Sequence, residues 1–350
     1  MRKIIFIPFI FLLCHNGKSQ VTKSLYDSTF TILSAMIEGK QPAEFKKAVF
    51  LVENSFLDGS MNYREFCSVI ERYRQLSELL FYSRDLQYQE SDKYSISVNA
   101  AVFTVMKDTI PIVLSEGKTG RTIPFGYDFE DISGDKSWTN MFVSKLLMTH
   151  KGNCHSLPYL YKILCEEFGA KAYLAYAPNH IYIKQHSKAF GWYNTELTSG
   201  MFPIDAWLMA SGYIHLNAVQ SGVYMDTLSQ KQSIGACLVD LAMGYEKRFG
   251  VGDGSFILKA CEKVLEHHPT NINALLLQAE TRMSLWKVET TQTKEQKQDE
   301  FIEIQELYTH IHELGYRKMP MEMYLKWLIS LKEEKDKYQN TRININFKQP

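Results

Sequence analysis

Apolar positions in the first part of the chain recur with the period of an α-helix. In AEFKKAVFLVENSFLDG, residues 43–59, apolar side chains keep a helical spacing until Asp58 and Gly59 end the pattern. NYREFCSVIERYRQLSELLFY, residues 62–82, carries a second apolar stripe on one helical face. The side chains of that stripe are Phe66, Val69, Ile70, Tyr73, Leu76 and Leu80. We therefore expect residues 22–84 to form a helical lead.

The segment that follows is less regular. SISVNAAVFTVM, residues 95–106, has β-branched and alternating character and fits either a strand or part of a helix. SEGKTGRTIPFGYDFEDISGDKSW, residues 115–138, is rich in Gly, Pro, Asp and Ser, which is typical of a long loop with turns. A loop of this length inside a compact domain is either functional or disordered. Because it lies just upstream of Cys154, we expect a functional loop.

The pattern sharpens from Trp138 onward. SWTNMFVSKLLMTHKG predicts one helix that begins after Ser137 and ends near Gly152. NCHSLPYLYKILCEEFGA predicts a second helix, over about 154–168, closed by Gly169. Three short β-type runs follow, AKAYLAYAP, HIYIKQH and GWYNTELT, the first two separated by a Pro-Asn pair. This order predicts a helix followed by an antiparallel set of strands.

Helical patterns return beyond residue 230 and are separated by Gly or Pro. The run ACEKVLEHHPTNINALLLQAE, residues 260–280, looks like the end of one tetratricopeptide-type helical hairpin and the start of another. The alternative is an ordinary helical appendage. In either case the C-terminal region is expected to be helical.

The N-terminus has the pattern of a secretory signal. Arg2 and Lys3 precede an apolar run, residues 4–13, which is shorter than the roughly 20 residues that span a bilayer. Small residues follow, so we expect cleavage before Gln20 and export of the mature chain. A lipid anchor on Cys14 is the less favoured alternative, because a leucine precedes it where a small residue is expected.

Charge and cysteine count narrow the function classes. Removing residues 1–19 takes away three of the 39 basic residues and none of the 39 acidic ones, which leaves a net charge of −3. This balance gives no reason to expect nucleic acid or an anionic membrane as a partner. Five cysteines remain, an odd number without any CxxC pair. We therefore expect at least one free thiol and no zinc ribbon.

Cys154 stands where a loop meets the start of a predicted helix. A thiolate there is stabilised by the helix dipole, and the first N–H groups of the helix can contribute to an oxyanion hole. Nucleophilic chemistry also needs a base and a group that orients the base. His180 opens the second β-type run, and Glu196 lies in the third. Two adjacent strands would bring both side chains to one face, where the carboxylate fixes the imidazole tautomer.

The order of these residues resembles the transglutaminase-like branch of the papain-type cysteine enzymes. In that family G-x-C opens the nucleophile helix, a histidine starts a strand, and W-x-x-x-D-x-T carries the acid. The chain has Gly152-Asn153-Cys154, His180 and the run WYNTELT, with Glu196 at the acid position in place of the usual Asp. KGNCHSLPYLYKILCEEFGAKAYLAYAPNHIYIK and AVFLVENSFLDGSMNYREF also resemble the bacterial SirB1-type subgroup. In that subgroup a helical lead precedes the core and tetratricopeptide-like helices follow it.

The resemblance implies a catalytic triad of Cys154, His180 and Glu196. In papain-like architecture an upstream side chain completes the oxyanion hole, and the resemblance suggests Trp138 for this role; the alternative is an aromatic side chain packed in the core. A competing hypothesis is a metal site formed by His150, Cys154 and His155, with His180 as a fourth ligand. The Gly-Asn pair between the first two residues argues against it, and we expect no metal and no cofactor.

We thus expect an α+β protein whose transglutaminase-like (papain-like) core packs a nucleophile helix on an antiparallel sheet. Residues 1–19 are assigned to the signal peptide, 20–115 to a helical N-terminal region, 116–228 to the core and 229–350 to a tetratricopeptide-like helical region. The expected function is acyl transfer or hydrolysis at an amide or peptide bond of a peptide or protein substrate. The alternative is a catalytically silent binding scaffold, whose C-terminal helices recruit a protein partner.

Overall fold

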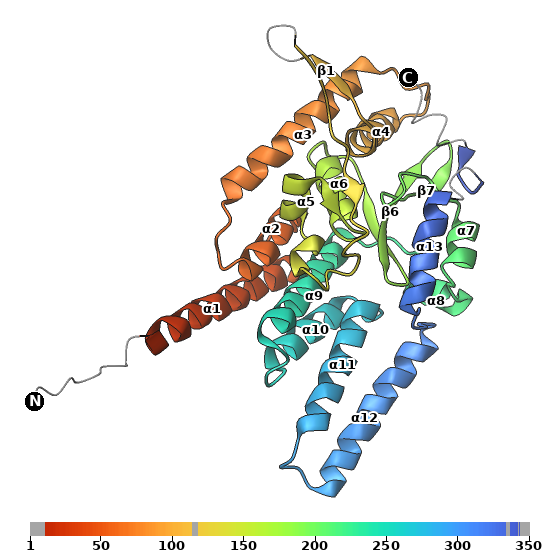
Figure 1. The fold of residues 1–350 in the computed structure, drawn as a ribbon. Coiled ribbons are helices and arrows are strands. Elements are labelled where there is room, and N and C mark those ends of the chain that lie inside the picture. The colour runs from red at the N-terminus through yellow and green to blue at the C-terminus, as the bar shows by residue number, and fades with distance from the viewer. Residues whose placement is uncertain (1–10, 114–117, 334–336, 342, 344–350) are drawn as a thin grey trace, which may run out of the picture.

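The computed structural model describes residues 11–113, 118–333, 337–341 and 343. Helices surround a three-stranded antiparallel sheet, and the chain also forms two small two-stranded sheets, one of which projects at the top of Figure 1, so the chain has the expected α+β class. The first ten residues of the expected signal peptide and the side chain of Cys14 lie outside the described part. None of the described helices is long and apolar enough to cross a bilayer.

The N-terminal region, residues 20–115, is mainly helical, as expected. Its helices are α1 (Phe11–Glu38), α2 (Phe45–Phe56), α3 (Tyr63–Ser83) and α4 (Lys93–Lys107). The stretch 95–106, which the sequence left open between strand and helix, lies within α4. Most of its side chains are buried because α4 packs against both α3 and α6. A helix buried on most sides has no polar face, so its period is hidden in the sequence.

The prediction of a single helix between Ser137 and Gly152 is wrong. The chain forms a short 3₁₀ helix, η2 (Trp138–Met141), and then α5 (Val143–Thr149), with an extended residue between them. The carboxylate of Glu53, from α2, accepts the N–H groups of Val143 and Ser144 at 2.6 and 3.0 Å. A distant carboxylate thus caps α5, a cause that local sequence does not contain.

The loop expected over residues 115–138 contains short strands. β1 (Pro111–Val113) pairs antiparallel with β2 (Thr119–Arg121). β3 (Gly126–Tyr127) pairs parallel with β4 (Lys151–Gly152). The second pairing holds the upstream segment directly against the residues that precede Cys154, so this segment forms part of the surroundings of the thiol.

The three β-type runs form one antiparallel sheet, which confirms their prediction. The sheet has the order β5-β6-β7, with β5 (Tyr173–Ala177), β6 (His180–Ser187) and β7 (Gly191–Thr195). A tight turn joins β5 to β6, and Asn179 adopts a positive φ of 55° there. α6 (Ser156–Glu166) packs on β5 and β6. The sheet therefore presents His180 at the turn beside the helix that follows Cys154.

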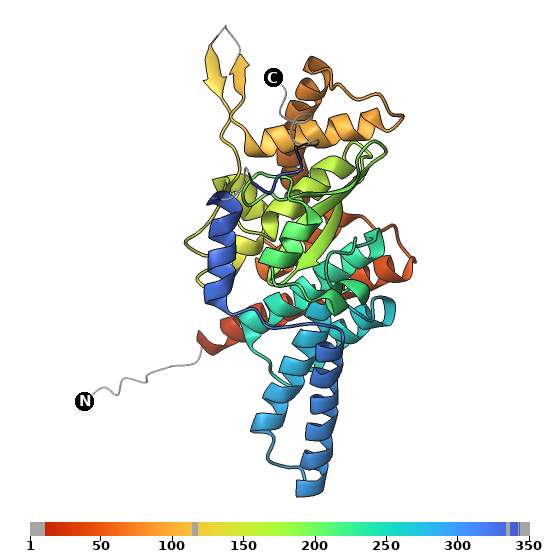
Figure 2. The same ribbon diagram turned by 90° about the vertical axis from the view of Figure 1, so that its right-hand side faces the viewer.

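The C-terminal region consists of helices, as expected. Before it, still within the expected core, two short helices follow the sheet, α7 (Asp205–Ser211) and α8 (Leu216–Gln220). The longer ones are α9 (Gln230–Phe249), α10 (Ser255–His267), α11 (Ile272–Val288), α12 (Lys294–Glu313) and α13 (Met321–Glu333). From α9 to α12 each helix packs on the next, as in a series of helical hairpins. Figure 2 shows α11 and α12 projecting from the rest of the molecule and α13 lying along the side of the main body.

The N-terminal helices, the expected core and the C-terminal helices share one apolar core. A single cluster of buried side chains runs from Tyr26 in α1 to Ile343 near the C-terminus. Helices α1 and α2 both pack on α9, although about 200 residues of sequence separate them. The boundaries near residues 115 and 228 thus divide the sequence without dividing the core.

Candidate active site

Cys154 lies in a turn between β4 and α6, two residues before α6 begins. The side chain of Asn153 caps the helix, because its Oδ1 accepts the N–H groups of His155 and Ser156 at 3.0 and 3.2 Å. The helix thus starts slightly later than expected. Two of the first amides that the sequence suggested for an oxyanion hole, those of His155 and Ser156, are thus already engaged by Asn153.

Gly152 has a steric reason to precede this turn. A Cβ atom at Gly152 would collide with the hydroxyl oxygen of Ser156. That hydroxyl accepts the N–H of Asn153 at 3.1 Å and donates to the carbonyl of Asn140 at 3.2 Å. The G-x-C order therefore reflects close packing between the strand end and the first turn of α6.

His180 and Glu196 meet as the strand order predicts. In the sheet Ile183 lies opposite Thr195, so extending this register places Glu196 diagonally across from His180. Long side chains bridge such diagonal positions. The Nε2 atom of His180 lies 2.6 Å from Oε2 of Glu196, and both side chains are almost fully buried. The other carboxylate oxygen accepts the N–H of Thr198 at 2.6 Å, which fixes the acid in place.

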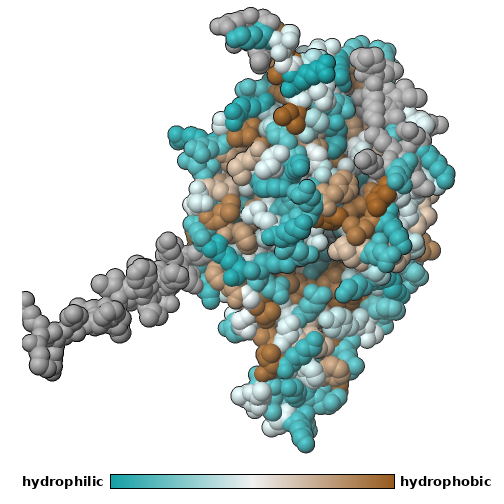
Figure 3. All heavy atoms as spheres, viewed as in Figure 1, coloured by the Kyte–Doolittle hydropathy of each residue, from teal (hydrophilic) through white to brown (hydrophobic). Residues whose placement is uncertain are grey.

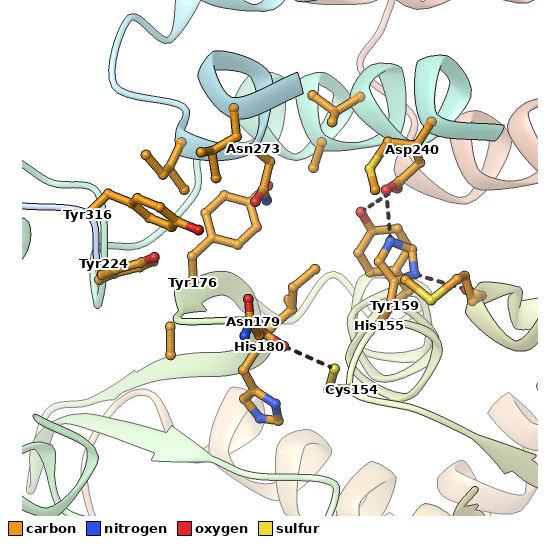
Figure 4. Close-up of a pocket in the computed structure, with 18 residues that line it drawn as sticks. Cys154, His155, Tyr159, Tyr176, Asn179, His180, Tyr224, Asp240, Asn273 and Tyr316 are labelled. Atoms are coloured by element: carbon orange, nitrogen blue, oxygen red, sulfur yellow. Dashed lines mark hydrogen bonds and ion pairs between the residues drawn. The ribbon is translucent and has the colours of Figure 1, made fainter. Parts of the chain in front are cut away.

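The thiol of Cys154 lies next to this pair. The hydroxyl of Tyr324, from α13, donates to Sγ of Cys154 at 3.3 Å. The same hydroxyl oxygen lies 3.3 Å from Nδ1 of His180. Nδ1 thus faces the side of the thiol while Nε2 faces Glu196. Sγ also lies 3.8 Å from the carbonyl oxygen of Asn179 (Figure 4).

These contacts set the protonation states of the three groups. Burial raises the pKa of Cys154, but the hydrogen bond and charge of His180, with a smaller contribution from the Tyr324 hydroxyl, hold it below its usual range. Burial lowers the pKa of His180, whereas Glu196 and the thiol together raise it to about 10. Burial raises the pKa of Glu196, but the charge of His180 and the hydrogen bonds from His180 and Thr198 hold this pKa below its usual range. The site therefore favours a thiolate beside an imidazolium.

The other buried cysteines behave differently. Within the described residues five cysteines are free, and Cys165, Cys237 and Cys261 are buried like Cys154. Burial raises the pKa of all three, to about 12 for Cys261 and further for Cys165 and Cys237. Burial alone thus makes a cysteine inert, and the contacts of Cys154 distinguish it.

A second histidine lies beside the thiol. The Nδ1 atom of His155 lies 2.9 Å from the carbonyl oxygen of Met141, and its Nε2 lies 3.0 Å from Oδ1 of Asp240 in α9. The Nε2 atom makes no hydrogen bond of good geometry, so its contact with Asp240 is electrostatic and favours the protonated ring. Burial lowers the pKa of His155 but Asp240 raises it above its usual range. The hydroxyl of Tyr159 completes the group by donating to Asp240 at 2.8 Å.

Trp138 does not join this group. It lines a neighbouring small cavity together with Glu53 and Cys237, and it is absent from the lining of the cavity that contains Cys154. The ammonium of Lys247, in α9, lies 5.6 Å from the centre of the Trp138 ring. Trp138 thus packs between α2 and α9 as a wedge, which is the alternative that the sequence left open.

The proposed metal ligands are engaged elsewhere. The ring nitrogens of His150 contact the hydroxyl of Tyr73 at 3.0 Å and the carbonyl of Ile123 at 2.8 Å, and the ring stacks on Phe125. His150 therefore points away from Cys154. Among the described residues no group of three or more potential ligand side chains is placed to hold a metal ion.

Sequence reasoning missed Tyr324 and Asp240. Tyr324 lies 170 residues after Cys154, and Asp240 lies 85 residues after His155. Neither residue belongs to a recognisable sequence motif. Each is a polar residue on the inward-facing side of a helix, where most of the other residues are apolar. The only available signal is general: a carboxylate or hydroxyl on the buried side of a helix needs a partner.

Comparison with protein-family models, with curated proteins and with solved structures finds no match for this chain. The function must therefore be argued from the geometry of the site.

Proposed function

We propose that the protein is a cysteine-dependent acyl-transfer enzyme or hydrolase that acts on amide or peptide bonds. The observation that carries the proposal is the contact chain from the Cys154 thiol through the Tyr324 hydroxyl to the His180 ring, and from there to the buried Glu196 carboxylate. This is the arrangement of nucleophile, base and orienting group that acyl transfer requires. It supports the transglutaminase-like core suggested by the resemblance.

In the first half-reaction the Cys154 thiolate attacks the carbonyl carbon of the substrate amide. The C–N bond then breaks, and the His180 imidazolium gives its proton to the leaving amine. The products are a thioester on Cys154 and a neutral His180. Glu196 keeps Nε2–H of His180 in place throughout, so Nδ1 faces the reacting atoms.

In the second half-reaction His180 removes a proton from the incoming nucleophile, which attacks the thioester carbon. Water gives a carboxylic acid, as in a protease or amidase, and an amine gives a new amide, as in a transglutaminase. In both cases the Cys154 thiolate leaves and the imidazolium is restored. The geometry of the triad is the same for both outcomes.

A second function, a binding scaffold, is favoured by the position of α13. Its Tyr324 and Trp327 are almost fully buried over the thiol and His180, and the Trp327 ring lies 4.7 Å from the His180 ring. The outer face of α13 exposes Met321, Leu325 and Ile329 at helical spacing, and Figure 3 shows an apolar area over this helix. A site covered in this way could serve to hold a protein partner through the C-terminal helices.

Alkylation of the intact protein at mildly acidic pH separates the two functions. We expect iodoacetamide to modify Cys154 much faster than Cys165, as followed by mass spectrometry of the digested protein. A synthetic peptide library incubated with the protein, with and without a small primary amine, then reports hydrolysis or amide exchange. Slow alkylation of Cys154, equal to that of Cys165, would favour the scaffold.

Export is part of the same proposal. We propose that residues 1–19 direct the chain across a membrane and are removed before Gln20. The first residue of the mature protein, determined on material purified from the expressing cell, tests this cleavage. A mature chain that begins at Cys14 and carries a lipid would replace it with the anchored form.

A further inference from the structure

A cavity of about 210 Å³ extends from the thiol of Cys154 toward the C-terminal helices. One wall comes from Cys154 and from the β5–β6 turn with Asn179 and His180. The opposite wall comes from α9 and α11, which contribute Val239, Asp240, Met243, Ile272, Asn273 and Leu276. Figure 4 shows these helices facing the turn across the cavity, with the rings of Tyr176, Tyr224 and Tyr316 at one end.

The size of the cavity suits one side chain. It is much larger than the roughly 10–15 Å³ that one water molecule needs. It is smaller than the ~300–1,000 Å³ typical of pockets that enclose a whole small ligand. The cavity thus has room for a single large substituent next to the sulfur.

The lining selects against charge. Among the described residues that line the cavity there is no Lys or Arg, and its charged groups already face partners: Asp240 faces His155 and Tyr159, and His180 faces the buried Glu196. The lining between these groups is mostly aliphatic and aromatic. A charged substituent would lose its water here without gaining a partner, which is unfavourable.

The position of the cavity assigns it to one side of the scissile bond. His180 lines the cavity next to the thiol, and in Figure 4 its ring points away from Tyr176 and Tyr316, so the end of the cavity at these tyrosines lies away from the imidazole. The leaving amine must stay near the imidazole that protonates it. The substituent in the cavity therefore belongs to the acyl part, which remains bonded to sulfur.

We infer that this cavity is the pocket for an uncharged, apolar side chain on the acyl residue of the substrate, an inference that rests on the proposed acyl chemistry of Cys154. The C-terminal helices α9 and α11 then determine substrate choice, although they lie outside the segment that carries the triad. Leu276 on α11 is partly exposed and lines the pocket, so it offers a position to change its size and charge.

Three alkylating agents test the pocket in the intact protein: iodoacetamide, N-benzyl-iodoacetamide and N-(4-carboxybenzyl)-iodoacetamide. Rates at Cys154 are measured by mass spectrometry and divided by the rates of the same agents with glutathione. Because the benzyl group would bury its apolar surface, we expect a corrected rate about tenfold above that of iodoacetamide. The carboxybenzyl agent should lose this gain.

Variants at Leu276 locate the effect. Leu276→Trp should fill the pocket and remove the preference for the benzyl agent, whereas Leu276→Lys should turn the preference toward the carboxybenzyl agent. Leu307→Trp, at a partly buried leucine of α12 outside the lining, is the matched control and should keep the wild-type ratio.

The outcomes distinguish this inference from the proposed function. If iodoacetamide modifies Cys154 no faster than Cys165, the acyl chemistry fails and the pocket with it. If iodoacetamide reacts fast but the corrected rates of all three agents are equal, the pocket assignment alone is wrong. A preference that survives both Leu276 variants would also overturn the assignment.

Discussion

Two buried histidine–carboxylate pairs flank the same thiol and differ in one contact. His180 binds Glu196 through Nε2, and its Nδ1 faces a hydroxyl that also contacts Cys154. His155 binds Asp240 through Nε2, but its Nδ1 faces the carbonyl of Met141. A hydroxyl can donate or accept, whereas a carbonyl can only accept. His180 is therefore able to gain and lose a proton toward the thiol, whereas His155 faces a carbonyl and has its pKa raised above the usual range by Asp240.

The comparison shows that pairing with a carboxylate does not by itself make a histidine a base. The ring also needs its second nitrogen free to exchange a proton with the reacting groups. When His155 is protonated, its positive charge lowers the pKa of the Cys154 thiol, and His155 itself exchanges no proton with the substrate. Substitutions at His180, Glu196, Tyr324 and Asp240 separate these two roles.

Replacing His180 should have the largest effect. In His180→Gln the thiol loses its base and the charge that stabilises the thiolate. We expect the alkylation rate of Cys154 at pH 6 to fall by about 100-fold or more. The rate at Cys67, which lies in α3 away from the site, should stay the same and serves as the internal control. An unchanged rate at Cys154 would refute the role of His180 as base.

Replacing Glu196 should have the next largest effect. Glu196→Gln keeps the shape of the side chain but removes the charge that holds the His180 proton. We expect the alkylation rate at pH 6 to fall by roughly 10- to 100-fold. Glu196→Asp tests whether the length of the acid side chain matters for its contact with His180. The shorter side chain should weaken the contact with Nε2 and give a rate between those of wild type and Glu196→Gln. Equal rates for Glu196→Asp and wild type would show that the extra methylene has no role.

Tyr324→Phe removes the hydroxyl that donates to sulfur. A hydrogen bond to a charged group contributes about 1.5–3 kcal/mol, and the Tyr324 hydroxyl affects the thiol pKa less than His180 does, so we expect the lower end of this range and a rate at pH 6 that falls by about tenfold. The thiol pKa, read from the pH dependence of alkylation, should rise by about one unit. A faster rate in Tyr324→Phe would instead mean that the hydroxyl mainly shields the thiol.

Asp240→Asn should have the smallest effect. Without the carboxylate, His155 is no longer held in its charged form, and a nearby positive charge is lost. Loss of a cation disfavours the thiolate, so the thiol pKa should rise and the rate at pH 6 should fall by roughly threefold. Circular dichroism of the variant checks that the fold is kept. A loss as large as that in His180→Gln would mean that His155, too, exchanges a proton with the thiol.

Contacts made within one local motif could be predicted from the sequence. The three β-type runs and the diagonal contact between His180 and Glu196 follow from strand order and alternation over 16 residues. The turn before α6 was also expected, apart from the amides that Asn153 engages.

Contacts between segments that are distant in the sequence could not be predicted in this way. Tyr324, Asp240 and Glu53 each come from a helix distant in sequence, and each decides a local feature: the donor to the thiol, the charge of His155 and the start of α5. The pairing of β3 with β4 likewise depends on the tertiary fold. These features depend on how helices pack in the shared core, which local propensity does not encode.

The pH dependence of Cys154 alkylation in the intact protein shows whether Cys154 and His180 form a thiolate–imidazolium pair. With the thiol pKa held low and that of His180 raised to about 10, the thiolate–imidazolium pair exists between the two values. We expect the rate to rise with a midpoint clearly below the ordinary cysteine pKa of about 8.5, to stay level through neutral pH, and to change again as His180 loses its proton. A single rise with a midpoint at about 8.5 or higher, unaltered in His180→Gln, would contradict the claim.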